Sequence, residues 1–317
     1  MLSVRDLCVS FRTEQGVLRA IDHVSFDVEA GEILGVVGES GSGKTVSLLA
    51  VMGLINDPNA TVTGSIRFKG RELVGLKPSD LRKLRGRDMA MIFQDPMTAL
   101  TPVYTIGTQI AEQITTHQNI SKRAALDRAV QLLAEVNIPK PEEAISRYPH
   151  QLSGGMRQRA VIAMALSNNP SLLIADEPTT ALDVTVQAQI LDLVRKLQRE
   201  HKSSVVFITH DMGVIAEIAD HVMVMYAGRI AERANKAEIF RRPLHPYTRA
   251  LLDSIPPLRG PRPPRLRAIP GAPPSLLHRT EACAFAPRCA KKIEICSLKP
   301  ALRGTEHEVA CHVVNHG

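Results

Sequence analysis

The sequence predicts an α/β fold with a mostly parallel sheet, an antiparallel β-subdomain, a helical subdomain and a cysteine-rich C-terminal extension. A glycine-rich segment stands between an apolar strand and a helix at residues 38–45. A second apolar strand ends in two carboxylates at residues 176–177. From residue 172 onward, strand and helix patterns alternate, which is typical of a parallel sheet covered on both faces. Together these features predict a fold organised around a phosphate-binding loop.

The glycine-rich segment lies between the apolar run 33–37 and a helical stretch at 46–52. Its residues have the order G-x-x-x-x-G-K-T and are Gly38, Glu39, Ser40, Gly41, Ser42, Gly43, Lys44 and Thr45. The glycines let the backbone turn its N–H groups onto phosphate oxygens, and the helix start adds a favourable dipole. Lys44 is expected to reach the β- and γ-phosphates, and the Thr45 hydroxyl to hold Mg²⁺. The segment therefore predicts a bound nucleoside triphosphate.

The paired carboxylates predict the second half of a triphosphatase site. The apolar run 171–175 ends in Asp176 and Glu177. Asp176 is expected to hold the Mg²⁺ shell, and Glu177 to polarise the attacking water. Acidic residues also end strands without any catalytic role, so the prediction of hydrolysis depends on their occurrence beside the phosphate-binding loop.

A second anion-binding helix start is predicted at Leu152-Ser153-Gly154-Gly155. Ser153 is a suitable cap for a helix that runs to about Leu166, and the two glycines expose backbone N–H groups at its positive end. One triphosphate cradled by the first loop does not need both elements from the same chain. We therefore expect Ser153, Gly154 and Gly155 to contact the nucleotide of a facing second cassette. With the strand and carboxylates that follow, this L-S-G-G run resembles the signature of the ATP-binding cassette family.

The resemblance to the cassette family implies ATP as the nucleotide, Mg²⁺ as the metal and several further site residues. It identifies Gln94 as the Q-loop residue that contacts Mg²⁺ and the water, and His210 as the switch histidine that senses the γ-phosphate. Phe11 stands where the family stacks an aromatic ring on adenine, although a phenylalanine in a strand is equally typical of a core. Residues 181–183 resemble the D-loop, which contacts the opposite subunit.

Hydrophobic periodicity gives the order of the elements. Alternating residues predict strands of the antiparallel β-subdomain at 2–11, 24–28 and 61–69. Amphipathic helices of the helical subdomain are expected at 106–117 and 121–136. The parallel sheet and its helices are predicted further on, in the segments 172–176, 186–197, 205–209, 214–219 and 222–226.

Two domains are expected in the 317 residues, because a chain of this length exceeds one small core. Residues 1–235 are predicted to form the ATP-binding domain, with the helical subdomain at about 97–165. Residues 236–317 are predicted to form the C-terminal extension. Its segment 255–274 is dense in proline and arginine, a composition that favours an extended connector.

Composition favours a globular protein, with 44% hydrophobic and 22% charged residues. No segment approaches the roughly 20 apolar residues that span a bilayer, and the first residues do not resemble a secretory signal. We therefore expect a peripheral protein at the cytoplasmic face of the inner, or plasma, membrane, held there by partners. The net charge of +7 is spread along the chain, and the sequence contains no Trp. No stacking platform for single strands is predicted, so nucleic acid is not an expected partner.

The segment His245-Pro246-Tyr247-Thr248 resembles the H-P-Y-T segment of the oligopeptide and dipeptide importer ATPases. This second resemblance covers essentially the whole chain and points in particular to the D-type subunits of dipeptide importers. It implies an ATPase subunit that pairs with a second ATPase, either similar or identical. It also implies two transmembrane permease subunits and an extracytoplasmic substrate-binding protein that delivers di- or oligopeptides.

Two other functions stay open at this point. A nickel or other small-solute importer of the same branch would use a similar ATPase, because substrate choice resides in the binding protein and the permeases. A soluble cassette protein that acts on translation or DNA belongs to a different class. Translation-type members carry two cassettes in one chain and chromosome-type members a long coiled coil, and this sequence has neither.

Four of the five cysteines lie beyond the connector, and they are Cys283, Cys289, Cys296 and Cys311. Disulfides are disfavoured in a cytoplasmic chain, so clustered cysteines indicate a metal. Four thiolates suit either Zn²⁺ or an iron–sulfur cluster. The short C-x2-C turn common in zinc ribbons is missing, and the resemblance to peptide importers implies a [4Fe-4S] cluster. Zinc and buried free thiols remain alternatives. Cys8, on an alternating strand, is predicted to be a small core residue.

Overall fold

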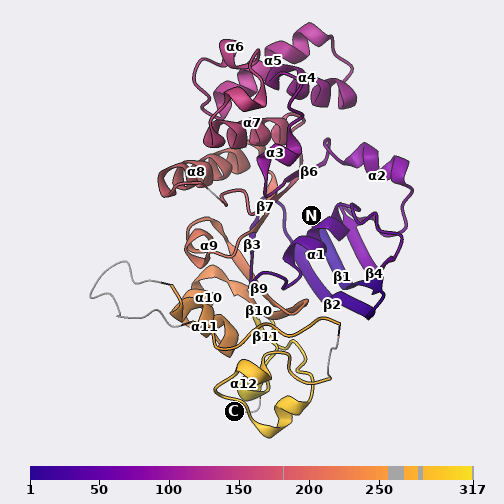
Figure 1. The fold of residues 1–317 in the computed structure, drawn as a ribbon, viewed down its shortest axis with the longest axis vertical. Helices are drawn as coiled ribbons and strands as arrows, with labels where there is room; N and C mark the ends of the chain where they lie inside the picture. The colour runs from indigo at the N-terminus through magenta and orange to yellow at the C-terminus, as the bar shows by residue number, and fades with distance from the viewer. Residues whose placement is uncertain (181, 256–267, 278–280, 316–317) are drawn as a thin grey trace. The chain divides into compact units, whose positions relative to one another are not determined.

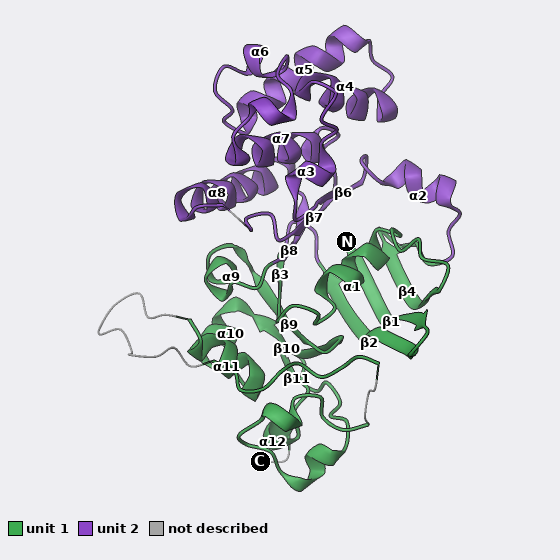
Figure 2. Ribbon diagram, in the orientation of Figure 1, with its two compact units in different colours: residues 1–28, 33–74, 209–317 green, residues 29–32, 75–208 purple. Residues whose placement is uncertain are grey.

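The computed structural model describes residues 1–180, 182–255, 268–277 and 281–315. Its contacts divide the chain into two compact units, coloured separately in Figure 2. Unit 1 comprises residues 1–28, 33–74 and 209–317. Unit 2 comprises residues 29–32 and 75–208. The chain thus passes from unit 1 into unit 2 and back twice, and the N-terminal strands and the C-terminal extension belong to the same unit.

An antiparallel sheet forms one part of unit 1 (Figure 1). Its strand order is β2-β1-β4-β5, from β1 (Leu2–Thr13), β2 (Gly16–Val28), β4 (Ala60–Phe68) and β5 (Arg71–Glu72). The antiparallel strands predicted from alternation are confirmed. β2 begins at Gly16, earlier than predicted, because it pairs with β1 through a tight hairpin in which Thr13 faces Gly16.

The second sheet of unit 1 carries the phosphate-binding loop. Its strands in unit 1 are β3 (Ile33–Val37), β9 (His221–Tyr226), β10 (Arg229–Asn235) and β11 (His307–Val309). β3 pairs in parallel with β9, whereas β9, β10 and β11 are successively antiparallel. Every residue of β3 is buried, which explains its uninterrupted apolar sequence.

Helix α9 (Met212–Ile218) packs on β3 of this sheet, and α1 (Lys44–Val51) contacts β1 and β2 of the antiparallel sheet. α9 approaches β3 so closely that a Cβ added at Gly35 would lie 2.7 Å from Ile215 Cδ1 and 3.0 Å from Ala219 Cβ. A glycine in the middle of β3 therefore avoids an overlap with Ile215 and Ala219, which would have to shift to admit a side chain.

The C-terminal extension is joined to the same sheet through β11, a strand that the sequence analysis did not predict. Val309 of β11 pairs with Glu232, and Arg233 forms an ion pair with Glu308 on the facing strands. The other described elements of the extension are α10 (Lys236–Arg241), α11 (Pro246–Asp253), η2 (Ala286–Arg288), η3 (Glu294–Ser297) and α12 (His312–Asn315). Most of the proline-rich connector lies outside the described residues. The domain boundary at 235/236 falls between β10 and α10 and stays a prediction.

Unit 2 contains a parallel sheet with the strand order β8-β7-β6. Its strands are β6 (Met89–Ile92), β7 (Leu172–Asp176) and β8 (Ser204–Ile208). Its helices are α2 (Pro78–Leu84), α3 (Pro96–Ala99), α4 (Ile106–His117), α5 (Lys122–Glu135), α6 (Pro141–Ala144), η1 (Pro149–Gln151), α7 (Gly154–Leu166) and α8 (Val184–His201).

Helices α4, α5, α6 and α7 form the helical part of unit 2 (Figure 1). α4 and α5 confirm the two predicted amphipathic helices. On α5 the buried positions are the predicted stripe, Ala125, Ala129, Leu132 and Leu133. Ser121 caps this helix by accepting a hydrogen bond from the Ala124 N–H at 3.2 Å. Among the described residues, we find no helix with the length and apolarity that a bilayer crossing requires.

Gly35→Val should lower the free energy of unfolding by about 1–3 kcal/mol, because the added side chain overpacks the contact between β3 and α9. Urea denaturation followed by circular dichroism measures this loss. Gly154→Ala is the control, since a Cβ there would meet no atom within 4 Å. Equal stability of Gly35→Val and the unaltered protein would show that α9 does not pack tightly on β3.

Candidate functional site

The glycine-rich loop of unit 1 has a backbone that only glycine adopts easily. Gly38, Gly41 and Gly43 have φ angles of 153°, 75° and 99°. A Cβ at Gly38 would lie 2.2 Å from the Met225 carbonyl oxygen, and one at Gly43 would lie 2.6 Å from Ile21 Cδ1. The loop is thus packed against its neighbours on two sides, and α1 begins directly after Gly43.

The polar groups inside this loop fit a bound anion. The Lys44 ammonium is buried and donates to the carbonyl oxygens of Gly38 at 2.8 Å and Glu39 at 3.1 Å. The Ser42 hydroxyl is also buried, and no hydrogen-bond partner for it exists among the described residues. The first turn of α1 contains no acidic residue. A positive helix end, an ammonium and an unsatisfied hydroxyl together suit a triphosphate and its Mg²⁺, with Thr45 at the helix start.

Glu39 connects the loop to the C-terminal extension within unit 1. Its backbone N–H donates to the Tyr247 hydroxyl at 2.8 Å. Its carboxylate accepts hydrogen bonds from both terminal nitrogens of Arg288, at 2.6 and 2.9 Å. These bonds to Glu39 raise the pKa of Arg288 above its ordinary value. The sequence analysis assigned no role to Arg288, and the only local signal was its position immediately before Cys289.

The carboxylates of unit 2 lie at the end of β7. Asp176 is buried, and Glu177 follows with a left-handed φ of 47° and donates its N–H to the Ile208 carbonyl at 3.0 Å. Gln94 Nε2 donates to Glu177 Oε2 at 3.2 Å, and the Thr180 hydroxyl donates to the same oxygen at 3.0 Å. The structure thus brings Gln94 and Glu177 together, and it adds Thr180, which the sequence analysis missed.

The L-S-G-G segment begins α7, which ends at Leu166 as expected. The Ser153 hydroxyl accepts a hydrogen bond from the Met156 N–H at 3.3 Å, which makes Ser153 the N-cap. Ser153 and Gly154 are exposed, and Gly155 is half-buried. A Cβ at Gly155 would lie 3.0 Å from Val186 Cγ1, so a larger residue would press on α8.

The remaining predicted residues are distributed over both units. Phe11 is half-buried in β1 of unit 1, opposite Leu18 and Ala60. His210 is exposed and belongs to unit 1. In the D-loop segment, Asp183 caps α8 by accepting from the Val186 N–H at 2.9 Å, and position 181 lies outside the described residues. The functional roles of all these residues stay predictions.

The four C-terminal cysteines lie near one another in unit 1. The Cys283 N–H donates to the Cys296 carbonyl oxygen at 3.0 Å. Burial raises the pKa of the Cys283 thiol, and the nearby Cys296 and Cys311 thiols raise it further. Burial likewise raises the pKa of Cys311, which has Cys289 and Cys296 as neighbours. Each of the four thiols therefore has another of the set within electrostatic reach.

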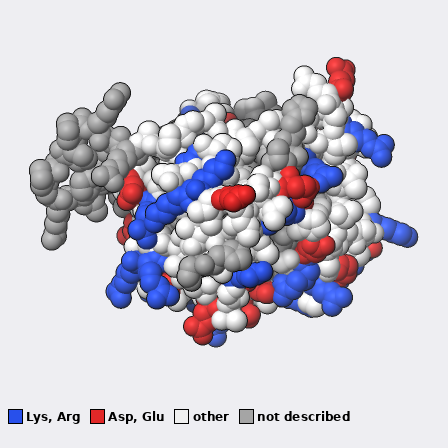
Figure 3. All heavy atoms as spheres, turned by 90° about the horizontal axis from the view of Figure 1, so that it is seen from below, with Lys and Arg blue, Asp and Glu red and all other residues white. Residues whose placement is uncertain are grey.

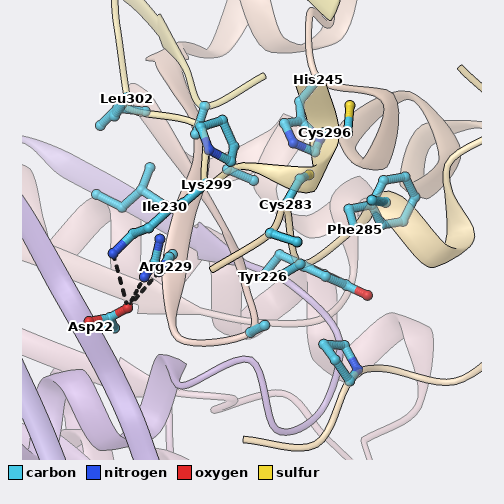
Figure 4. A pocket seen from close by; sticks show the side chains of 18 of the residues that line it. Asp22, Tyr226, Arg229, Ile230, His245, Cys283, Phe285, Cys296, Lys299 and Leu302 are labelled. Carbon is cyan, nitrogen blue, oxygen red and sulfur yellow. Dashed lines mark hydrogen bonds and ion pairs between the residues drawn. The ribbon is translucent and has the colours of Figure 1, made fainter. Parts of the chain in front are cut away.

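Two of these cysteines also line a cavity of about 790 Å³ in unit 1. Figure 4 shows Cys283 and Cys296 on one side of it and the side chains of Asp22, Arg229 and Lys299 on the other. Asp22 is ion-paired with both cations. Asp22, Cys8 and His23 also each offer one possible metal-ligand atom, and these three atoms lie within 4.8 Å of one another. Because the charge of Asp22 is already balanced, we assign no metal there. Cys8 is half-buried, and its sulfur accepts from the His23 N–H at 3.3 Å.

Comparisons with protein-family models give two matches. Residues 21–180 match the model described as ABC transporter. Residues 231–296 match the model described as the C-terminal region of the oligopeptide/dipeptide transporter. The first match contains the glycine-rich loop and the paired carboxylates, and the second contains Tyr247 and Arg288.

Relatives with high identity span nearly the whole chain. The oligopeptide transport ATP-binding protein OppD of Bacillus subtilis is 51% identical over 296 residues, which cover 93% of this chain and 83% of that protein. The dipeptide transport ATP-binding protein DppD of Haemophilus influenzae is 48% identical over 314 residues, which cover 98% and 95%. The sequence resemblance to peptide importer ATPases is therefore confirmed.

A solved structure supports the cassette fold. The dimeric, post-hydrolysis state of the ATP-binding cassette MJ0796 bound to ADP and Pi superimposes with a TM-score of 0.67 at 26% sequence identity. The match covers 74% of this chain and 99% of that cassette, so the rest of this chain has no counterpart there. Since the loop that fits a triphosphate lies in the matched family region and relatives align along the whole length, this chain belongs to the ABC transporter family, as an ATP-binding protein of its oligopeptide/dipeptide branch.

Proposed function

We propose that this chain is the ATPase subunit that powers import of di- or oligopeptides across the cytoplasmic membrane. The observation that carries the proposal is the match of residues 231–296 to the oligopeptide/dipeptide C-terminal region, in the same chain as the phosphate-binding loop. The names of the relatives, oligopeptide and dipeptide transport ATP-binding proteins, support the same substrate class.

Nucleotide binding would use the groups of the loop described above. Lys44 would exchange its hydrogen bonds with the Gly38 and Glu39 carbonyls for bonds to the β- and γ-phosphates. The Ser42 hydroxyl, buried without a described partner, would gain one. Thr45, Gln94 and Asp176 would hold Mg²⁺, whose charge stabilises the phosphate oxygens during transfer. Phe11 would stack on the adenine.

Hydrolysis would depend on Glu177. Its carboxylate would accept a proton from the attacking water and orient it toward the γ-phosphate. Gln94 and Thr180 both donate to Oε2, which fixes the orientation of the carboxylate. His210 would sense the γ-phosphate and thus complete the catalytic set.

The active form would be a dimer of two cassettes. Ser153 and Gly154 are exposed at the start of α7, and with Gly155 they would bind the ATP held by the partner ATPase. Two ATP molecules would close the dimer, and hydrolysis would reset it. The dimeric state of the solved cassette supports this arrangement. The partner is either a second, similar ATPase or a copy of this chain.

Transport would require three further proteins. Two permease subunits would receive the motion through the helical subdomain, and an extracytoplasmic binding protein would deliver the peptide. The chain itself would sit at the cytoplasmic face of the membrane, held by the permeases. Nucleic acid is a poor alternative partner, because on the face drawn in Figure 3 basic and acidic side chains are interspersed.

The substrate is tested in the transporter reconstituted with its permeases and binding protein. ATPase activity should rise on addition of binding protein loaded with a dipeptide or oligopeptide. Stimulation by nickel-loaded protein and none by peptides would instead favour the small-solute alternative. Basal ATPase activity without any permease requirement would favour a soluble cassette protein.

The four-cysteine module would hold a [4Fe-4S] cluster. Tetrahedral Zn²⁺, with Zn–S bonds of about 2.3 Å, needs all four sulfurs in close mutual contact. Among the described residues, no three of these cysteines place their sulfurs within 4.8 Å of one another. A [4Fe-4S] cluster would be held by the thiolates of Cys283, Cys289, Cys296 and Cys311, and it would accept sulfurs that lie further apart than those around a single ion. When bound, the cluster would supply cross-links that a module with few apolar residues lacks.

Glu177→Gln should slow ATP hydrolysis by a factor of about 10²–10⁴ in the assembled transporter, because the water loses its base. ATP affinity should stay within about twofold of the unaltered protein, since the phosphate cradle is intact. Lys44→Ala, by contrast, should weaken ATP binding itself. Steady-state hydrolysis and equilibrium binding separate the two effects. Hydrolysis by Glu177→Gln at the unaltered rate would show that another group is the base.

Ser153→Arg should abolish turnover of the assembled transporter without weakening ATP binding to the isolated chain, because Ser153 serves the partner's nucleotide. Ala124→Arg is the control, an exposed position on α5 of the same unit. It should leave both quantities unchanged. A large loss of ATP affinity in isolated Ser153→Arg would mean that the signature segment acts within its own chain.

Anaerobically purified protein should be brown and contain about four irons per chain if the cysteines hold the cluster. Cys296→Ser should lose the colour and most of the iron, whereas the matched variant Cys8→Ser should keep both. Metal analysis and visible absorption measure the outcome. One zinc per chain in colourless protein would identify a zinc site, and protein without bound metal would contradict any metal site.

A further inference from the structure

A buried arginine joins the cysteine-bearing segment to the phosphate-binding loop within unit 1. Arg288 is the last residue of η2 and directly precedes Cys289. Its side chain is only 4% exposed, and it makes a two-pronged ion pair with the Glu39 carboxylate at 2.6 and 2.9 Å. Glu39 is the second residue of the loop. The two residues are 249 positions apart in the chain, so this contact exists only in the folded extension.

The Arg288 guanidinium is held from several directions. Its Nε donates to the Pro270 carbonyl at 2.8 Å, and one terminal nitrogen donates to the Tyr226 hydroxyl at 3.3 Å. Its central carbon lies 5.9 Å from the Tyr226 ring centroid and 6.0 Å from that of Phe285. A planar group fixed in this way specifies the position of the carboxylate it binds, which a flexible ammonium would not do.

Tyr247 provides a second contact from the extension to the same loop residue. Its side chain is fully buried, and its hydroxyl accepts the Glu39 N–H at 2.8 Å. Tyr247 packs against Tyr226 and Phe285, with ring centroids 4.6 and 5.4 Å away. The extension therefore fixes both the backbone and the carboxylate of Glu39. The carbonyl of Glu39 in turn accepts from Lys44 Nζ at 3.1 Å, which continues the contact to the phosphate-binding lysine.

We propose that Arg288 is a positioning residue for ATP, and that through Glu39 it couples the conformation of the segment 283–298 to the ATP affinity of the loop. The coupling rests on ATP binding at this loop. A loop whose backbone is fixed before the nucleotide arrives loses less conformational freedom on binding, and its affinity is correspondingly higher. Because such coupling is reciprocal, bound ATP also stabilises the segment that carries Arg288.

A purely structural ion pair would behave differently. It would contribute to the stability of the extension, and its loss would lower the melting temperature without a specific effect on the nucleotide. The Arg233–Glu308 pair is the natural comparison, because it joins β10 to β11 at 2.5 Å and is also partly buried. It anchors the same extension, but neither of its residues touches the phosphate-binding loop in the described contacts.

The first test is the dissociation constant for ATP of the full-length chain. Arg288→Met should weaken binding by about tenfold, within the usual range for coupled sites. Arg288→Lys should have an intermediate effect, because an ammonium keeps the charge but not the paired geometry. Arg233→Met should stay within about twofold of the unaltered protein. An Arg288→Met affinity that equals that of Arg233→Met would overturn the proposal.

A double-mutant cycle then tests whether Glu39 carries the effect. In the background of Glu39→Gln, the further change Arg288→Met should cost less than about twofold in ATP affinity, because the carboxylate is already absent. If the two losses simply multiply, Arg288 does not act through Glu39. Lys44→Ala tests separately whether ATP binds at this loop. Normal ATP binding by that variant would contradict nucleotide binding at the loop, whereas weakened binding leaves the coupling to be decided by the Arg288 variants.

Amide hydrogen exchange measures an effect of ATP on the segment 283–298 that a purely structural ion pair would not produce. Mg²⁺-ATP should slow exchange in peptides covering 283–298 of the unaltered protein, and this protection should be lost in Arg288→Met. Thermal unfolding verifies that the variant is folded. If it does not fold, the unaltered protein still decides the question. Absence of nucleotide-dependent protection in 283–298 would contradict the coupling.

Discussion

Unit 1 depends on holding one glycine-rich loop, with the buried Lys44 ammonium inside it, in a single conformation. The loop does not fix its own conformation, because its glycines add backbone freedom, although the ammonium donates to the Gly38 and Glu39 carbonyls. Contacts from distant segments supply the constraint. The Gly228 N–H donates to the Ser42 carbonyl at 2.8 Å, and the Gly228 carbonyl accepts from Asp22 at 2.9 Å. Tyr247 and Arg288 fix Glu39 from the other side.

Buried charge organises the C-terminal extension in the same way. Glu232 on β10 is 0% exposed. Its carboxylate accepts from the N–H groups of Leu244 and His245 and contacts His307 Nε2 at 2.6 Å. One carboxylate thus joins β10, the start of the H-P-Y-T segment and β11. Burial lowers the pKa of His245 to about 4, so its imidazole is neutral near pH 7 and its Nδ1 accepts the Tyr247 N–H at 3.0 Å. This bond begins α11 and places Tyr247 beside the loop.

Unit 2 meets a different requirement, which is to present a carboxylate in a defined orientation. Glu177 has a left-handed backbone, which is unfavourable for a residue with a side chain. The bond from its N–H to Ile208 offsets this cost, and the donors from Gln94 and Thr180 orient its carboxylate. The surrounding contacts maintain this strained backbone, and strain of this kind is typical of residues at functional sites.

Elements with local signals could be predicted from the amino-acid sequence alone. The G-x-x-x-x-G-K-T spacing predicted the loop and the start of α1, because only glycines adopt its backbone and the lysine must follow them. Ser153 predicted the beginning of α7, and the apolar stripe of α5 predicted its buried face, since capping and helical period depend on neighbours within a few residues. These signals were enough for the fold class and for the family.

Contacts between residues that are far apart in the chain could not be predicted, because they form only when the elements pack together. β11 has three residues and no pattern of its own, and it becomes a strand because β10 offers an edge to pair with. The sequence did not indicate the partner of Arg288, because Glu39 is brought to it by packing over a long separation. Thr180 lies only three residues after Glu177, and it is the turn of the backbone there that brings its hydroxyl to the carboxylate. In an unfolded chain, an arginine and a glutamate 249 positions apart can each pair with many other residues of opposite charge. The buried site that excludes those alternatives exists only after the sheet and the extension have come together.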